Sequence, residues 1–233
     1  VINVTGGSFV NFDPSNNLAE GAGTDFLADG YKTLSEKDNS KTVYTVVELN
    51  PIEKAVAEGA NTVVLSEDLV LDETIAVASE LTIDLGGKAL STETTPAFLA
   101  NADLTIKNGT ANVAKELVRV GAGVTVTLDD VTATSAGDNC VFVPKESKDA
   151  AVVVAEGTSL TSKGAAAIQS NGNTVGLDLT IAGTVVSEGD VAVYLPQVEK
   201  CTVASTAKIT GVTGIEIRAG ELVVEDGAEI SAG

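Results

Sequence analysis

Histidine, methionine and tryptophan are absent from this chain, which has only five phenylalanines and three tyrosines. Without histidine there is no histidine-based catalytic triad, no histidine metal ligand and no general base of the commonest kind. Without many large rings, the core has to be built from stacked layers of small and β-branched residues, which favour strands. The absences therefore point to an all-β scaffold with few of the usual means of catalysis.

Cysteine is also scarce, since only Cys140 and Cys201 are present. Two residues are too few for a cysteine-rich zinc site. They lie more than two sequence repeats apart, and stacked strands are separated by about 4.8 Å. Their Cα atoms should therefore exceed the roughly 7 Å limit for a disulfide. A disulfide remains the alternative, but two buried thiols are expected.

Basic residues are few, with 14 Lys and Arg against 33 Asp and Glu, for a formal net charge of −19. Such a charge repels phosphate backbones and anionic lipid surfaces, so nucleic-acid and membrane-surface partners are not expected. No run of about 18 apolar residues is present either, so no membrane insertion is predicted. No nucleotide-binding loop or EF-hand pattern occurs, and no cofactor or bound metal is expected.

A repeated pattern of short apolar runs fills most of the chain. The three clearest copies are LTIDLGGKALS from Leu81, LTIKNGTANV from Leu104 and VTVTLDDVTA from Val124, and related openings occur near residues 62, 152, 179, 202 and 222. Each repeat of about 20 to 27 residues holds three short strand-like runs, as a parallel β-helix requires. Residues 61–233 are therefore predicted to form a right-handed parallel β-helix of about seven to eight coils, with three strands per coil.

Two different segments precede the repeats. Residues 13–49 are rich in turn formers and aromatics and read as an irregular cap or plug module, ending in a hairpin formed by YKTLSE and KTVYTVVE. Residues 50–60 predict a short helix, with Asn50 as N-cap, Pro51 in the first turn, Glu53 completing a capping box and Gly59 at the end. This helix is expected to cover the first coil.

The first twelve residues resemble a β-helix strand that has no coil before it. Ile2 to Ser8 follows the same order of apolar, polar, turn and glycine positions as Leu104 to Thr110, and also resembles Leu222 to Ala228. The chain could be cut from a longer solenoid, the segment could fold back onto its own C-terminal end, or it could dock on the open end of another copy. A chance match in a chain rich in Val, Thr and Gly is a fourth explanation.

The docking hypothesis names an assembly interface. Its predicted residues are Ile2, Val4, Gly6, Gly7, Phe9 and Phe12 on the N-terminal side, and Leu222, Val224 and Ile230 on the C-terminal side. A head-to-tail contact that does not close on itself builds a filament. The expected partner is therefore another copy of the same chain.

Candidate catalytic residues are few. Asp129 and Asp130 could form a carboxylate pair, but neighbours on a strand point to opposite faces, so a turn is the preferred interpretation. Asp84 and Lys107 occupy equivalent positions in successive coils and predict a surface ion pair. The two arginines, Arg119 and Arg218, are expected to lie far apart. Asn108 starts a glycosylation sequon but is interpreted as a turn residue. No catalytic site is predicted.

Two segments resemble a known group of proteins. GGSFVNFDPSNNLAEGAGTDFLADGYK, from Gly6 to Lys32, is similar to a capping motif of pectate-lyase-like β-helix domains in gut bacterial surface proteins and phage structural proteins, and LTIDLGGKALS is similar to their first-coil motif. The resemblance implies an extracellular or virion scaffold, not an enzyme. In that group the cap follows the coils, whereas here it precedes them.

These observations predict a non-enzymatic structural subunit of an extracellular assembly, a fibre or surface filament built head to tail. One alternative is a phage virion fibre or capsid-decoration protein, which would bind a virion protein. Another is a carbohydrate-binding or carbohydrate-cleaving β-helix, which would bind a glycan and would show acidic and basic side chains converging in a cleft.

Overall fold

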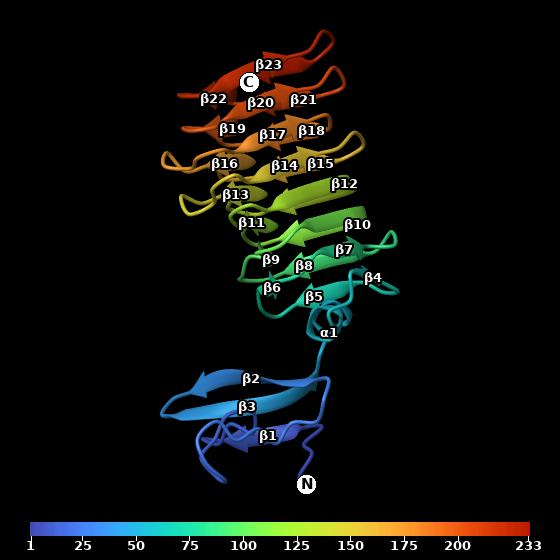
Figure 1. Ribbon diagram of the computed structural model, residues 1–233, viewed down its shortest axis with the longest axis vertical. Helices are drawn as coiled ribbons and strands as arrows, with labels where there is room; N and C mark the ends of the chain where they lie inside the picture. The colour runs from blue at the N-terminus through green and yellow to red at the C-terminus, as the bar shows by residue number, and fades with distance from the viewer. The chain divides into compact units, whose positions relative to one another are not determined.

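The computed structural model describes residues 1–233 and divides into two compact units, Val1–Ala57 and Glu58–Gly233. Figure 1 shows the first as a small sheet with loops and the second as a stack of coils. The two units are described separately below.

The N-terminal unit holds a three-stranded antiparallel sheet in the order β1-β3-β2. Its strands are β1 (Gly7–Val10), β2 (Tyr31–Asp38) and β3 (Lys41–Glu48). The predicted hairpin is confirmed, because β2 and β3 pair along their whole length. Its turn is tighter than expected and consists of Asn39 and Ser40, with Asn39 in the left-handed region at φ 55°. Asparagine tolerates that conformation better than most residues do.

The N-terminal segment differs from the strand that the sequence match predicts. Instead of a strand from Ile2, the structure has an isolated bridge between Val4 and Leu27 and a strand that begins at Gly7. This strand pairs antiparallel with β3, placing Phe9 opposite Tyr44, whereas coils of a β-helix pair in parallel. Alternation of apolar and polar residues reports which side is buried, not which strand is the partner. The strand therefore begins at Gly7, five residues after Ile2, where the sequence match begins.

Helix α1 (Pro51–Glu58) begins as its sequence predicts. The Asn50 side chain accepts hydrogen bonds from the N–H groups of Ile52 and Glu53, both at 3.0 Å, and the Glu53 carboxylate accepts one from the Asn50 N–H at 2.9 Å. This is the reciprocal capping box. Gly59 follows with φ 68° and ends the helix. No helix has the length and apolar character needed to cross a membrane.

The second unit is a β-solenoid of about eight coils, whose strands form three parallel faces. The first face comprises β4 (Thr62–Val64), β7 (Leu81–Asp84), the first half of β10 (Leu104–Val113), the first half of β12 (Thr125–Ser135), β14 (Ala151–Val154), β17 (Asp178–Ile181), β20 (Lys200–Val203) and β23 (Glu221–Val224). The second comprises β5 (Leu69–Leu71), β8 (Ala89–Thr92), the second halves of β10 and β12, β15 (Ser159–Ser162), β18 (Thr184–Ser187), β21 (Lys208–Gly211) and β24 (Glu229–Ala232).

The third face is a separate sheet of seven strands. It comprises β6 (Ile75–Val77), β9 (Phe98–Ala100), β11 (Val118–Val120), β13 (Val141–Val143), β16 (Ile168–Ser170), β19 (Val191–Leu195) and β22 (Thr213–Ile217). Successive strands on each face pair in parallel. The prediction of a parallel β-helix with three strands per coil is confirmed, and its coil openings lie within two residues of the observed ones.

The core is a set of ladders that run from coil to coil. One inward ladder on the first face has every member at most 1 % exposed and consists of Ile83, Ile106, Leu128, Val154, Ile181 and Val203. Aliphatic side chains of similar size stack directly on one another, so each coil buries the apolar side of the next. Cys140 and Cys201 are both free and buried in this interior, which confirms the prediction of two thiols.

Single residues turn the chain between the first and second faces. In β10 and β12 the strand continues through the corner, and Asn108 and Asp130 take left-handed φ angles of 58° and 53° there. Asn and Asp are among the few non-glycine residues that visit this region readily. The turn interpretation of Asp129-Asp130 and of Asn108 is therefore confirmed.

Candidate assembly surface

The last coil of the solenoid has an open edge. β23 pairs with β20 and β24 pairs with β21, and neither strand has a partner on its other side. Each therefore presents a row of backbone N–H and C=O groups that can pair with a further strand. Strands at this edge can be extended by another chain through the backbone alone.

The inward side chains of this coil are uncovered. Leu222, Val224 and Ile230 are 44 %, 47 % and 41 % exposed. The residues that they stack on one coil earlier are Cys201, Val203 and Ile209, none of which is more than 1 % exposed. Positions that are core elsewhere in the solenoid are thus surface here, and covering them would remove apolar area from water. We call this end, formed by β23 and β24, the terminal surface.

The rim of the terminal surface is acidic. Glu221, Glu225, Asp226 and Glu229 all lie exposed in the last coil. The Glu225 carboxylate accepts a hydrogen bond from the Ser205 N–H at 3.0 Å, and Glu229 lies 3.6 Å from the Lys208 ammonium group. These contacts connect the rim to the preceding coil, but the rim keeps a net negative charge. Any docking partner that is itself acidic will be repelled at low ionic strength.

The N-terminal residues predicted for the interface lie in the other unit. Ile2 is 61 % exposed and Phe12 39 %, while Val4 and Phe9 are half-buried. The rings of Phe9 and Phe12 contact each other with centroids 6.2 Å apart. Gly6 and Gly7 are exposed where the chain enters β1. Since β1 is an outer strand of its sheet, one of its backbone edges is open.

The structure thus places the predicted interface residues in two separate groups. Leu222, Val224 and Ile230 share the terminal surface, and the residues from Ile2 to Phe12 lie in the N-terminal unit. Sequence reasoning missed three further exposed apolar residues of that unit, namely Val1, Val10 at 55 % exposure and Leu18 at 79 %. Val10 is recognisable only once the pairing of β1 is known. Leu18 stands in a turn-rich stretch, where an apolar residue is itself a signal of a contact surface.

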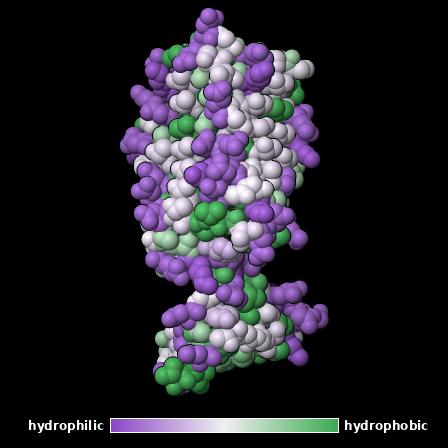
Figure 2. Space-filling model, turned by 90° about the vertical axis from the view of Figure 1, so that its right-hand side faces the viewer, coloured by the Kyte–Doolittle hydropathy of each residue, from purple (hydrophilic) through white to green (hydrophobic).

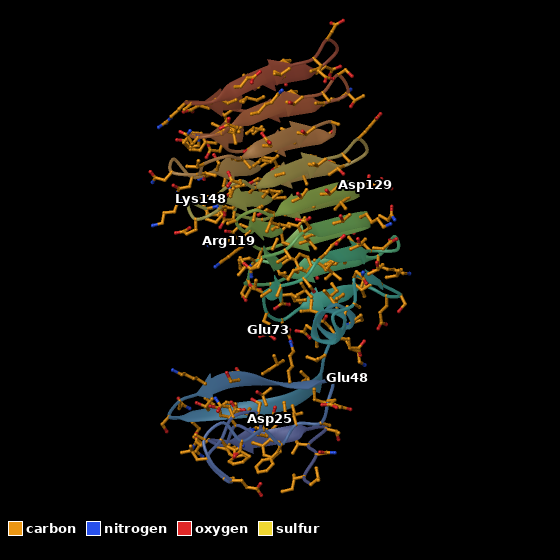
Figure 3. The ribbon with its side chains drawn as sticks, in the orientation of Figure 1. Asp25, Glu48, Glu73, Arg119, Asp129 and Lys148 are labelled. Carbon is orange, nitrogen blue, oxygen red and sulfur yellow. The ribbon has the colours of Figure 1, made fainter.

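The remaining candidates lie on the sides of the solenoid. Asp84 and Lys107 form the predicted ion pair, with the ammonium nitrogen 3.7 Å from the carboxylate. A hydrogen bond from the Gly86 N–H, helped by the Asn108 amide and Lys107, lowers the pKa of Asp84. Asp129 and Asp130 are both exposed at their corner, and Asp129 is labelled there in Figure 3. The contacts of Asp84 hold a corner of the solenoid in place, and Asp129 and Asp130 lie at another corner. These residues do not form a pair of carboxylates that face a common substrate.

Arg119 lies in β11 and Arg218 just after β22, so four coils separate them, as expected. The aromatic ring beside each arginine was not predicted. Residues on the outer side of the third face can be matched to one another only after coils of unequal length have been aligned. The side of the solenoid shown in Figure 2 carries hydrophilic residues interspersed with weakly polar ones and no single large apolar patch.

No family model, no curated protein and no solved structure matches this chain.

Proposed function

We propose that the chain is a non-enzymatic structural subunit of an extracellular assembly, joined end to end through its terminal surface. The observation that supports this proposal is the exposure of Leu222, Val224 and Ile230 beside two unpaired strand edges. Strand addition to such an edge gives affinity through backbone hydrogen bonds, while pockets between alternate side chains give register. A surface of this kind is suited to stacking and not to turnover of a small substrate.

The occupant that fits best is the N-terminal unit of a second copy. It offers β1, an outer strand with one open edge, and the apolar alternation of Ile2, Val4 and the following residues resembles that of the last coil. Of the twelve large apolar residues that are most exposed, five lie in the N-terminal unit and three are Leu222, Val224 and Ile230. The two surfaces are therefore the main uncovered apolar regions of the molecule.

A contact between different surfaces of identical subunits is heterologous. Such a contact gives a ring if the rotation closes and an open filament if it does not. The proposed assembly is a filament, in which every subunit provides one terminal surface and one N-terminal unit. The two ends of the filament keep one unsatisfied surface each, so growth depends on subunit concentration.

The test is sedimentation velocity and negative-stain microscopy of the whole chain over a range of concentrations, alongside the double variant Leu222→Asp/Ile230→Asp. The unaltered chain should form species that lengthen with concentration, and the variant should remain monomeric, because two buried carboxylates oppose docking. Val175→Asp serves as the matched control, since Val175 is an exposed apolar residue in a lateral turn. It should assemble like the unaltered chain.

Two results would overturn the proposal. One is an unaltered chain that stays monomeric at every concentration, which would leave the edge to a different protein or to further coils of a longer chain. The other is equal loss of assembly in the Val175 variant. Circular dichroism checks that both variants keep the melting temperature of the parent, as expected for residues that are already largely exposed.

A further inference from the structure

A polar pocket of about 270 Å³ lies on the third face of the solenoid, away from the terminal surface. It sits over β11, β13 and β16, on the side from which Arg119 projects in Figure 3. The small side chain of Ala165 forms part of its lining. The neighbouring Asn139 and Glu116 are 4 % and 3 % exposed, so two polar side chains are held deep in its wall.

An outward row of side chains borders the pocket. Parallel pairing aligns Arg119 with Phe142, Phe142 with Gln169 and Gln169 with Tyr194. Phe142 and Tyr194 are the two rings of the solenoid outside its core, since the third, Phe98, is fully buried. Both arginines of the chain lie over these rings, Arg119 at 5.2 Å from the Phe142 centroid and Arg218 at 5.3 Å from that of Tyr194.

The polar groups of the pocket are held by one another. The Glu116 carboxylate accepts a hydrogen bond from Arg119 at 2.5 Å, which fixes the guanidinium above Phe142. Asn139 donates to the Ala166 carbonyl at 2.6 Å and to the Gln169 side-chain oxygen at 3.3 Å. An orientation fixed in advance costs less entropy when a ligand binds.

Three side chains that line the pocket, Arg119, Asp138 and Gln169, still have donors or acceptors that a ligand can use. Gln169 accepts through its oxygen and keeps its amide hydrogens, and Arg119 uses one of its five donors on Glu116. Asp138 accepts the Asn139 N–H through one carboxylate oxygen, at 2.9 Å, and has a second oxygen to offer. The pocket thus combines fixed donors and acceptors with one aromatic ring, in a space of about 270 Å³.

We propose that this pocket binds one uncharged hexose residue of a glycan. A sugar ring has an apolar C–H face, which fits Phe142, and a rim of hydroxyls, which both donate and accept, as Gln169, Arg119 and Asp138 require. Charge disfavours an anionic ligand, because Arg119 is neutralised by Glu116, Asp138 adds a negative charge, and the whole chain carries −19. The same charge disfavours lateral contact with a second copy.

The test is an NMR titration of the ¹⁵N-labelled chain with cellobiose, maltose and lactose, and separately with galacturonate as an anionic probe. At least one neutral disaccharide should shift the side-chain amide signals of Asn139 and Gln169, and galacturonate should not. Phe142→Ala and Gln169→Ala should each weaken binding about tenfold, the size expected for loss of one packed or hydrogen-bonded group.

Tyr194→Ala is the matched control, because Tyr194 also lies under an arginine, Arg218, but does not line this pocket. Arg218 is itself hydrogen-bonded to Glu216 at 2.9 Å. Its affinity should equal that of the parent chain. The proposal is overturned if no neutral disaccharide shifts the two amides, if galacturonate alone binds, or if Tyr194→Ala loses as much affinity as Phe142→Ala. Since the pocket lies away from β23 and β24, variants of the terminal surface should bind the disaccharide unchanged.

Discussion

The hydroxyl of Ser162 donates a hydrogen bond to the backbone carbonyl of Asp138, 2.8 Å away and one coil earlier. The same oxygen accepts a hydrogen bond from the N–H of Ala165 at 3.1 Å. Ser135 and Ser187 repeat both contacts in the coils on either side, donating to Lys115 and Ala165 respectively. A ladder of buried serines thus satisfies the backbone at the corner between the second and third faces, where the strands no longer do so.

Ser162→Ala should lower the free energy of unfolding by about 1–3 kcal/mol, because the part-buried Asp138 carbonyl and Ala165 N–H lose their partner together. Ser159→Ala, in the same strand but half-exposed on its outer side, is the control and should change it by less than about 0.5 kcal/mol. Urea unfolding followed by circular dichroism measures both. Equal midpoints for the two variants would show that the ladder does not stabilise the corner.

Gly109 marks a second corner, directly after Asn108. A Cβ atom on Gly109 would lie 2.5 Å from the Leu85 Cβ and 2.7 Å from the Lys88 carbonyl oxygen, so the preceding coil leaves no room for one. Gly109→Ala should therefore destabilise the solenoid by about 1–3 kcal/mol through overpacking. Gly137→Ala, where no atom lies within 4 Å, is the control and should be neutral or slightly stabilising. Thermal unfolding of the two variants decides, and an unchanged melting temperature for Gly109→Ala would contradict the close approach.

Burial raises the pKa of both the Cys140 and Cys201 thiols to about 12, from an ordinary value of 9.0. In the unfolded chain the thiols lose their protons near pH 9, whereas in the folded chain they keep them until about pH 12. The unfolded state then binds fewer protons, so stability is present below pH 9 and falls as the pH rises from 9 to 12.

The double variant Cys140→Ala/Cys201→Ala should show a shallower alkaline decline than the parent, although its stability at pH 7 will be lower because two small cavities form. An aromatic disulfide reagent provides an independent readout. Native protein should react at the rate of unfolding, since the thiolate is the reactive form. Immediate reaction of either cysteine in native protein at pH 8 would contradict its burial.

Salt should promote the proposed end-to-end contact. The rim of the terminal surface is acidic, and the N-terminal unit has eight Asp and Glu against four Lys between residues 1 and 57. Raising NaCl from about 20 mM to about 500 mM shortens the screening length several-fold and should strengthen association. Light scattering at fixed subunit concentration measures the change, with Leu222→Asp/Ile230→Asp as the variant that should remain monomeric throughout. Dissociation at high salt would mean that ion pairs, and not apolar burial, hold the contact.

Much of the fold could be predicted because the coil repeat is encoded locally. Alternation at Leu104, Ile106, Ala111 and Val113 places one side of each strand inward, and the repeat length leaves room for three strands in each coil. The N-terminal strand was misplaced, since Ile2 to Thr5 has the alternation of a strand but β3 offers its pairing edge to Gly7–Val10. Pairing partners are a property of the folded chain, and a seven-residue pattern does not specify them.

The last coil of the solenoid could be predicted from the repeat, because Leu222, Val224 and Ile230 occupy the same repeat positions as buried residues of the preceding coil. The pocket on the third face could not. It depends on Arg119, Phe142 and Gln169 falling into one row, although the intervening segments differ in length and composition. A partial signal was present in the sequence, since the motif Ser-x-Gly recurs at Ser135, Ser162 and Ser187 and aligns three of these coils.

Each coil of the solenoid is hydrogen-bonded only to the coil before it and the coil after it. The free energy of such a structure is close to a sum of coil terms and nearest-neighbour terms, as in a one-dimensional array. Both end coils of the solenoid have a neighbouring coil on one side only, so thermal fraying starts at the ends, and from β23 and β24 it advances inward as a front, one coil at a time. A subunit docked on the terminal surface would block that front at its origin, so filament growth and protection from unfolding would be the same event.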